Sequence, residues 1–192
     1  MIAVAIVALG LTLGLPSFAA WLRNSQIRTA AESMQNGLRQ AQTEAVRRNT
    51  IVRFQLTTTL DSGCALSTTG PYWVVNMGGS TTPASGCDSA ISDSTSPYIL
   101  AVSPTVTSQS TVVSTASRSV VAFDGLGRQV ATTNPSTSVA QFKVQLTSTG
   151  DSCVAVNGSA RCLNVIVEAA GQIRVCDPAQ SKTNALNAAS AC

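Results

Sequence analysis

The sequence predicts an α+β protein in which one long N-terminal helix carries an antiparallel β-sheet head. No charged residue occurs from Met1 to Leu22, and an apolar stripe with helical spacing continues beyond this run. The remainder is poor in charge and rich in Ser, Thr, Val, Ala and Gly, which favours strands and turns. We therefore expect a hydrophobic helix over 1–22, an amphipathic half of the same helix over 23–50, and a β-rich head over 51–192. Residues 1–50 are called the stem below.

The uncharged run at the start of the stem is long enough to cross the roughly 30 Å hydrocarbon core of a bilayer as a helix. Ser17-Phe18-Ala19 could be a cleavage site, but no basic region precedes the apolar run and the helical pattern continues past it. A membrane anchor is therefore favoured over a signal peptide. Gly10 and Gly14 have the spacing of a helix dimerisation face. With Pro16 close by, they more readily indicate a segment that unwinds during assembly.

The second half of the stem has a helical stripe of apolar residues at steps of three and four. Its members are Ile27, Ala31, Met34, Leu38, Ala41 and Ala45. Alanine dominates this stripe, so it offers little surface for gripping another helix but allows close approach to a sheet. We expect the stripe to pack on the sheet of the head rather than to form a coiled coil.

Eight segments of the head are typical of strands by composition or alternation. They are 51–56, 72–75, 99–102, 111–113, 119–123, 141–147, 162–168 and 172–176. Within 141–147, the alternation predicts that Phe142, Val144 and Leu146 face a core and that Lys143 and Gln145 face water. After 119–123, the pair Asp124-Gly125 is expected to supply the positive φ of a tight turn.

The charge distribution and the missing residue types exclude several classes of function. The net charge is +3, but residues 1–53 carry +4 and the rest carries −1, from six basic and seven acidic residues. The head therefore lacks a large electrostatic footprint for nucleic acid. The chain has no histidine, no phosphate-binding glycine loop and no G-x-S-x-G motif. We expect no enzymatic activity and no cofactor, and we interpret Asp124 as a turn former.

The six cysteines are even in number, dispersed, and without a C-x-x-C pair or a histidine to complete a zinc site. We expect structural disulfides in an oxidising compartment and no metal. Nearest-neighbour pairing, Cys64–Cys87, Cys153–Cys162 and Cys176–Cys192, is slightly favoured. If the turn of the last hairpin centres on Ala169, Cys162 would instead lie opposite Cys176 and could bridge to it.

Three stretches resemble known proteins. Residues 1–18 resemble the N-terminal segment of type IV pilins and pseudopilins, taken from just after their Phe-Thr-Leu-Ile-Glu-Leu start, and Pro16 falls where those proteins have their helix-breaking proline. The leader peptide, its cleavage site and the N-terminal glutamate of these proteins are not found in the sequence, so by this resemblance the chain is expected to begin about six residues into the mature sequence. Residues 34–49 and the run Phe123-Asp124-Gly125-Leu126-Gly127-Arg128 resemble the GspH/FimT family. The resemblance implies the pilin fold.

The resemblance also implies a function, which is that of a minor pilin at or near the tip of a type IV pilus, where it helps to start the fibre. The implied partners are other minor pilins and the major pilin, which would contact the chain through stem packing. Before assembly the chain would lie in the inner membrane as a single-pass protein with a periplasmic head, and afterwards outside the cell in the fibre. A pseudopilin of a type II secretion system is the alternative.

A DNA-binding minor pilin is a further alternative. FimT-type members carry a Gly-Arg-x-Arg motif before a cysteine, and the resemblance links that motif to DNA capture. This chain has Gly171-Gln172-Ile173-Arg174-Val175-Cys176, in which glutamine replaces the first arginine. Arg161, Arg174 and Lys182 could form a small patch that binds double-stranded DNA weakly and with strong salt dependence. The other interpretation is that Arg174 is an ordinary exposed strand residue.

Overall fold

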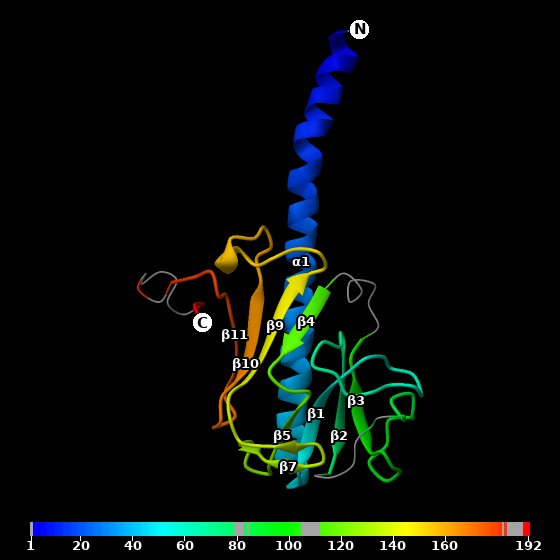
Figure 1. Cartoon of the computed structure of the whole chain (residues 1–192). Helices are drawn as coiled ribbons and strands as arrows, with labels where there is room; N and C mark the ends of the chain where they lie inside the picture. The colour runs from blue at the N-terminus through cyan, green and yellow to red at the C-terminus, as the bar shows by residue number, and fades with distance from the viewer. Residues whose placement is uncertain (1, 79–82, 84, 105–111, 182, 184–189) are drawn as a thin grey trace.

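A computed structural model describes residues 2–78, 83, 85–104, 112–181, 183 and 190–192, with side chains from Phe18 onward. One helix, α1 (Ile2–Arg48), forms the stem, and its N-terminal part projects beyond the head (Figure 1). No helix in the described part of the chain is long and apolar enough to span a membrane. Most side chains of the predicted hydrophobic segment 1–22 lie outside the described residues. The backbone of α1 is helical through Gly10, Gly14 and Pro16.

The C-terminus of α1 is closed by a Schellman motif. Asn49 adopts a left-handed conformation with φ 49°, and the amide of Thr50 donates to the carbonyl of Ala45 at 3.2 Å. Arg47 and Arg48 in the last turn favour the negative end of the helix dipole. Both arginines donate to Glu44, at 2.6 Å and 2.7 Å, and the bonds from Arg47 and then Arg48 lower the pKa of that carboxyl.

The apolar stripe of α1 faces the sheets, as the sequence predicts. All six of its members, from Ile27 to Ala45, are at most 3% exposed. The small alanine side chains allow the strands to approach the helix closely, and Gly37 lies against the ring of Trp73. The amphipathic half of the stem is therefore fixed to the head along its length.

In the part of the head that the structure describes there are eleven short strands, and every pairing between them is antiparallel. A five-stranded sheet has the order β3-β2-β1-β5-β6, a four-stranded sheet has the order β11-β10-β9-β4, and β7 pairs with β8. The strand bounds are β1 Val52–Thr57, β2 Tyr72–Met77, β3 Ile99–Val102, β4 Val112–Ala116, β5 Val120–Phe123, β6 Gln129–Val130, β7 Thr132–Thr133, β8 Ser136–Thr137, β9 Phe142–Ser148, β10 Leu163–Val167 and β11 Ile173–Cys176. All eight predicted strands are present, whereas β6, β7 and β8 are too short to leave a sequence pattern.

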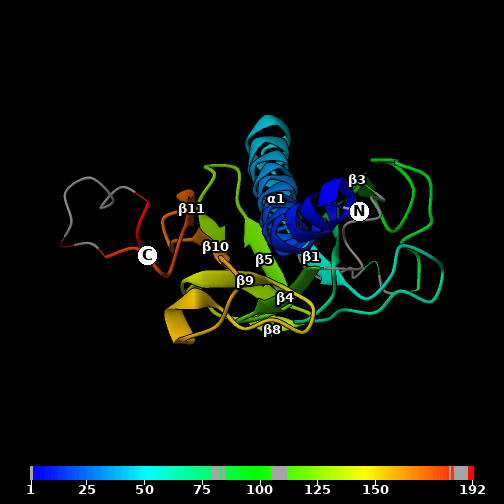
Figure 2. The same cartoon turned by 90° about the horizontal axis from the view of Figure 1, so that it is seen from above.

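One hydrophobic core joins the helix to both sheets. Seen from above, α1 lies along one side of the strands (Figure 2). Phe54 of β1 stacks on Trp73 of β2 with ring centroids 5.6 Å apart. In β9 the predicted alternation is confirmed, because Phe142 and Val144 are fully buried and Lys143 is exposed.

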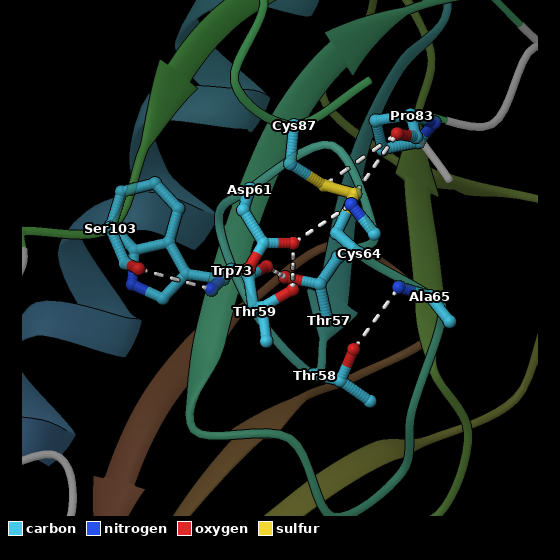
Figure 3. The surroundings of a disulfide bond; sticks show 11 residues. Thr57, Thr58, Thr59, Asp61, Cys64, Ala65, Trp73, Pro83, Cys87 and Ser103 are labelled. Carbon is cyan, nitrogen blue, oxygen red and sulfur yellow. Dashed lines mark hydrogen bonds between the residues drawn. A yellow bond between two sulfur atoms is a disulfide. The ribbon is translucent and has the colours of Figure 1, made fainter. Parts of the chain in front are cut away.

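Two loops rich in serine and threonine cover the outer face of the five-stranded sheet. They contain Cys64 and Cys87, which form a disulfide and pack with Val74 and Ile99 in a second apolar cluster. The carbonyl of Pro83 lies 3.2 Å from the sulfur of Cys64 (Figure 3). The disulfide and this small cluster hold the segments around Cys64 and Cys87 against the sheet, although the composition of the loops alone would suggest disorder.

The same outer face buries an arginine. Arg53 of β1 is fully buried and donates to the carbonyl of Asn134, at the turn between β7 and β8, at 2.8 Å. Gln55 and Asn76 lie beside it on the sheet, with 3.1 Å between their side-chain amides. Burial lowers the pKa of Arg53 to about 10. Arg53 is thus part of the interior and not of a basic surface.

The six cysteines form the nearest-neighbour disulfides Cys64–Cys87, Cys153–Cys162 and Cys176–Cys192. The rival bridge between Cys162 and Cys176 required a hairpin turn centred on Ala169. In the structure Asn164, not Cys162, lies opposite Cys176. The register differs because the turn extends to Gly171, whose positive φ the apolar alternation of the strands does not encode.

The expected turn after β5 is present, but its geometry differs from the prediction. Asp124 is a turn former, since its carboxylate accepts from the amides of Leu126 and Arg128 at 2.9 Å and 3.0 Å. The positive φ, however, occurs at Gly127 and not at Gly125. Gly125 is instead needed because a side chain there would collide with Asn49 at the end of α1.

Candidate functional site

The motif Gly171-Gln172-Ile173-Arg174 lies in the hairpin between β10 and β11. Residues 168–172 form its turn, in which the amide of Gly171 donates to the carbonyl of Glu168 at 2.8 Å. Gly171 has φ 92°, a conformation that residues other than glycine rarely adopt. The glycine of the motif is therefore required by the turn itself.

Gly171 also forms the junction between this hairpin, the turn after β5, and α1. A Cβ atom at Gly171 would overlap the carbonyl oxygen of Gly127. The side-chain amide of Gln42 on α1 donates to both glycine carbonyls, at 2.6 Å to Gly127 and at 2.9 Å to Gly171. Gln42 thus ties one turn from each sheet to the helix. Gln42 lies off the apolar stripe in the sequence, and no local pattern indicates this contact.

A second polar link joins the two sheets next to this junction. The side-chain amide of Gln129 in β6 donates to the carbonyls of Val167 and Glu168 at 3.0 Å and 3.1 Å. Arg118 donates to the amide oxygen of Gln129 at 2.8 Å and lies over the ring of Phe142. Burial lowers the pKa of Arg118. No motif marked Gln129 or Arg118, because their partners lie in other segments of the chain.

Arg174 projects from β11 beside the hairpin turn. It lies opposite Ile166, is half-buried, and forms an ion pair with Glu168 at 3.1 Å. Glu168 also accepts from Gln141 at 3.1 Å. The carboxylate offsets the charge that Arg174 would present to a phosphate, whereas Gln172 is exposed and uncharged.

Arg161 lies at the other end of the hairpin. Its guanidinium donates at 2.7 Å to Asp177, a carboxylate that is only 4% exposed. Five residues of strand separate Arg161 from the register position of Arg174, which corresponds to roughly 16 Å. The structure does not bring these two arginines together, and Lys182 lies outside the described residues.

A groove of 430 Å³ lies between α1 and the β11 edge of the four-stranded sheet. Its walls include Arg28 and Glu32 of the helix, which pair with each other at 3.0 Å, and Arg161 and Asp177 of the head. The charges in the groove are thus mutually compensated. Within the described residues, no group of three or more His, Cys, Asp or Glu side chains could hold a metal ion.

A single long helix is fixed by one apolar stripe to antiparallel sheets and is joined to their turns through Gln42. This is the architecture that the resemblance to pilins implies. A family model described as type II transport protein GspH matches residues 30–171. The chain belongs to this GspH family, and the resemblance identified in the sequence is confirmed. The match covers the stem from residue 30 onward and every strand that the structure describes except β11.

Two solved structures resemble the chain, both of the type IV minor pilin FimU of Pseudomonas aeruginosa. One is 12% identical and covers 82% of this chain and 94% of FimU with a TM-score of 0.48. The other is also 12% identical and covers 83% and 92%, with a TM-score of 0.49. No curated protein matches the chain.

Proposed function

We propose that the chain is a minor pilin of a type IV pilus, incorporated at or near the pilus tip, where it helps to start the fibre. The observation that carries this proposal is the division of the stem into two halves. From Ile27 to Ala45 the helix is packed against its own head. Residues 1–22 contain no charged residue, and the N-terminal part of the helix extends beyond the head (Figure 1). A free apolar helix on a rigid head can pack against other such helices in a fibre core.

The same uncharged segment supports an inner-membrane location before assembly. A helix of 22 residues without charge is long enough for a single span. The head would then lie in the periplasm, an oxidising compartment, which is consistent with its three disulfides. When the chain enters a fibre, its apolar helix would leave the lipid and pack against the apolar stems of other minor pilins and the major pilin. Gly10, Gly14 and Pro16 would let the helix bend to fit that packing.

A pseudopilin of a type II secretion system is the second candidate, because the matching family model is described as a type II transport protein. Both candidates use the stem in the same way and differ only in the fibre that contains the chain. Double-stranded DNA as a partner receives less support. Arg161 and Arg174 lie at opposite ends of the hairpin, and each has a carboxylate partner.

Deletion of the gene in its source organism, followed by assays of pili and of secreted proteins, separates these functions. Loss of surface pili, together with recovery of other minor pilins in pull-downs of the tagged protein, supports the minor-pilin proposal. Loss of secretion with normal pili would replace it with the type II secretion pseudopilin.

A further inference from the structure

At the end of the head from which α1 emerges, a loop closed by a disulfide exposes two valine side chains. The 3₁₀ turn η2 (Val154–Val156) lies in the loop between β9 and β10, and Figure 1 shows this yellow-orange segment at the stem end of the head. The Cys153–Cys162 disulfide closes the loop. Val154 is 47% exposed and Val156 is 68% exposed.

This turn is held in place rather than loosely attached. Its backbone amides at Val156 and Asn157 donate to the carbonyls of Cys153 and Val154 at 2.9 Å and 3.1 Å, and Asn157 ends it in a left-handed conformation. No charged residue occurs from 152 to 160. The disulfide and the hydrogen bonds prevent the two valines from folding back into the core.

Two contacts set the height of the loop along the stem. Arg23 of α1 forms an ion pair with Asp151 at 3.4 Å, just before the disulfide. Asn24 accepts from the amide of Arg161 at 3.4 Å, just inside its other end. The loop is therefore fixed at the level where the first charged residue of the stem occurs.

The helix at this level is also apolar and exposed. Phe18 and Trp21 are stacked with ring centroids 5.9 Å apart and are 62% and 63% exposed, and Leu22 is 44% exposed. Ten large hydrophobic side chains are exposed among the described residues, and five of them, these three with Val154 and Val156, lie at this end of the head. Such a concentration indicates a contact surface.

We propose that these five residues form a membrane-contacting collar that rests on the bilayer interface while the stem is inserted. The inference rests on the membrane location proposed above. Lipid fits because the collar is continuous with the uncharged helix and because tryptophan prefers the membrane interface. Arg23, the first charged residue, marks where the uncharged segment ends. The collar holds the head at a fixed height above the membrane and limits its tilt before the subunit enters a fibre.

Fluorescence quenching by brominated lipids tests the collar in the full-length chain. The variant Trp21→Phe with Val156→Trp is reconstituted in phosphatidylcholine–phosphatidylglycerol vesicles with bromine at the top of the acyl chains. The remaining tryptophan, Trp73, is 5% exposed and gives a constant background. Interfacial side chains lie about 5–10 Å into the headgroup and acyl boundary, so we expect roughly a twofold loss of the added emission.

Val139→Trp in the same Trp21→Phe background is the matched control. Val139 is 48% exposed like Val154, but it precedes β9 and lies at the far end of the head. Its emission should not change. Val154→Trp provides a second test if Val156→Trp does not fold.

The unmodified chain distinguishes failure of the collar from failure of membrane insertion. If Trp21 is quenched and neither Val154→Trp nor Val156→Trp is, the stem inserts and the collar is refuted. If Trp21 is also unquenched, the proposed membrane location fails with it. Emission that shifts only at high protein density, without quenching, would assign the turn to contacts between neighbouring subunits and overturn the proposal.

Discussion

The junction at Gly171 predicts different responses from two glycines that share a backbone conformation. Gly171 and Gly150 have φ of 92° and 80°, which costs other L-residues roughly 1–2 kcal/mol. A Cβ atom at Gly171 would overlap the carbonyl oxygen of Gly127, whereas nothing lies within 4 Å of a Cβ at Gly150. Alanine at Gly171 must therefore push two turns apart, and alanine at Gly150 need not.

The magnitude follows from the bonds that this displacement breaks. Separation of the two turns removes the hydrogen bonds of Gln42 to both carbonyls, each worth about 1 kcal/mol net. Together with the backbone cost, Gly171→Ala should destabilise the head by roughly 3–4 kcal/mol, against about 1–2 kcal/mol for Gly150→Ala. In a domain of this size these values lower Tm by about 10 °C and about 4 °C.

Thermal unfolding of the two variants in detergent, followed by circular dichroism, measures this difference. Gln42→Leu should reproduce the part of the Gly171→Ala loss that comes from the two hydrogen bonds. Equal Tm shifts for Gly171→Ala and Gly150→Ala would show that the hairpin does not depend on its contact with Gly127, and the structural role assigned to the motif glycine would be refuted.

Three further predictions concern charge, disulfide and ligand. Because the pKa of Glu44 is lowered, its ion pairs stabilise the fold above its ordinary pKa of 4.5, and this contribution disappears as the pH falls through the lowered pKa. The Tm of Glu44→Gln should therefore fall less steeply from neutral to acidic pH than the Tm of the unsubstituted chain. Replacing Cys64 and Cys87 with serine opens a loop with a sequence separation of 23 and should lower the free energy of unfolding in urea by about 3 kcal/mol. Both covering loops should then become sensitive to protease, and unchanged proteolysis would contradict their dependence on the disulfide. Duplex DNA should not shift with the protein in a gel at 150 mM salt, because Arg174 is paired with a carboxylate; a shift that Arg174→Ala abolishes would favour the DNA-binding alternative.

The sequence was sufficient to predict the elements that depend on local patterns. The stripe from Ile27 to Ala45 and the alternation around Val144 each encode one buried face, and both faces are buried in the structure. Disulfide pairing by proximity in the chain was also recovered. The register of the last hairpin could not be predicted, because it depends on a turn that includes Gly171 with a positive φ. The alternation of apolar residues does not encode that backbone angle.

The polar interior could not be predicted for a different reason. Arg53 is buried because β7, β8 and the long loops cover the outer face of the sheet. No local sequence pattern predicts that these segments lie over Arg53. Gln42 and Gln129 satisfy backbone carbonyls that are distant in the chain, so each looks like an ordinary polar surface residue in the sequence. Arg161 and Arg174 occupy opposite ends of one hairpin, and the sequence does not encode this separation.

Immunogold labelling of fibres sheared from the cell surface tests the central proposal most directly. A minor pilin that helps to start the fibre should be labelled at fibre ends, and a variant with Asp in place of Leu11 within the uncharged run should lose this labelling while the head still folds. Finding the protein only in the membrane fraction, with sheared pili free of label, would contradict its incorporation into a type IV pilus.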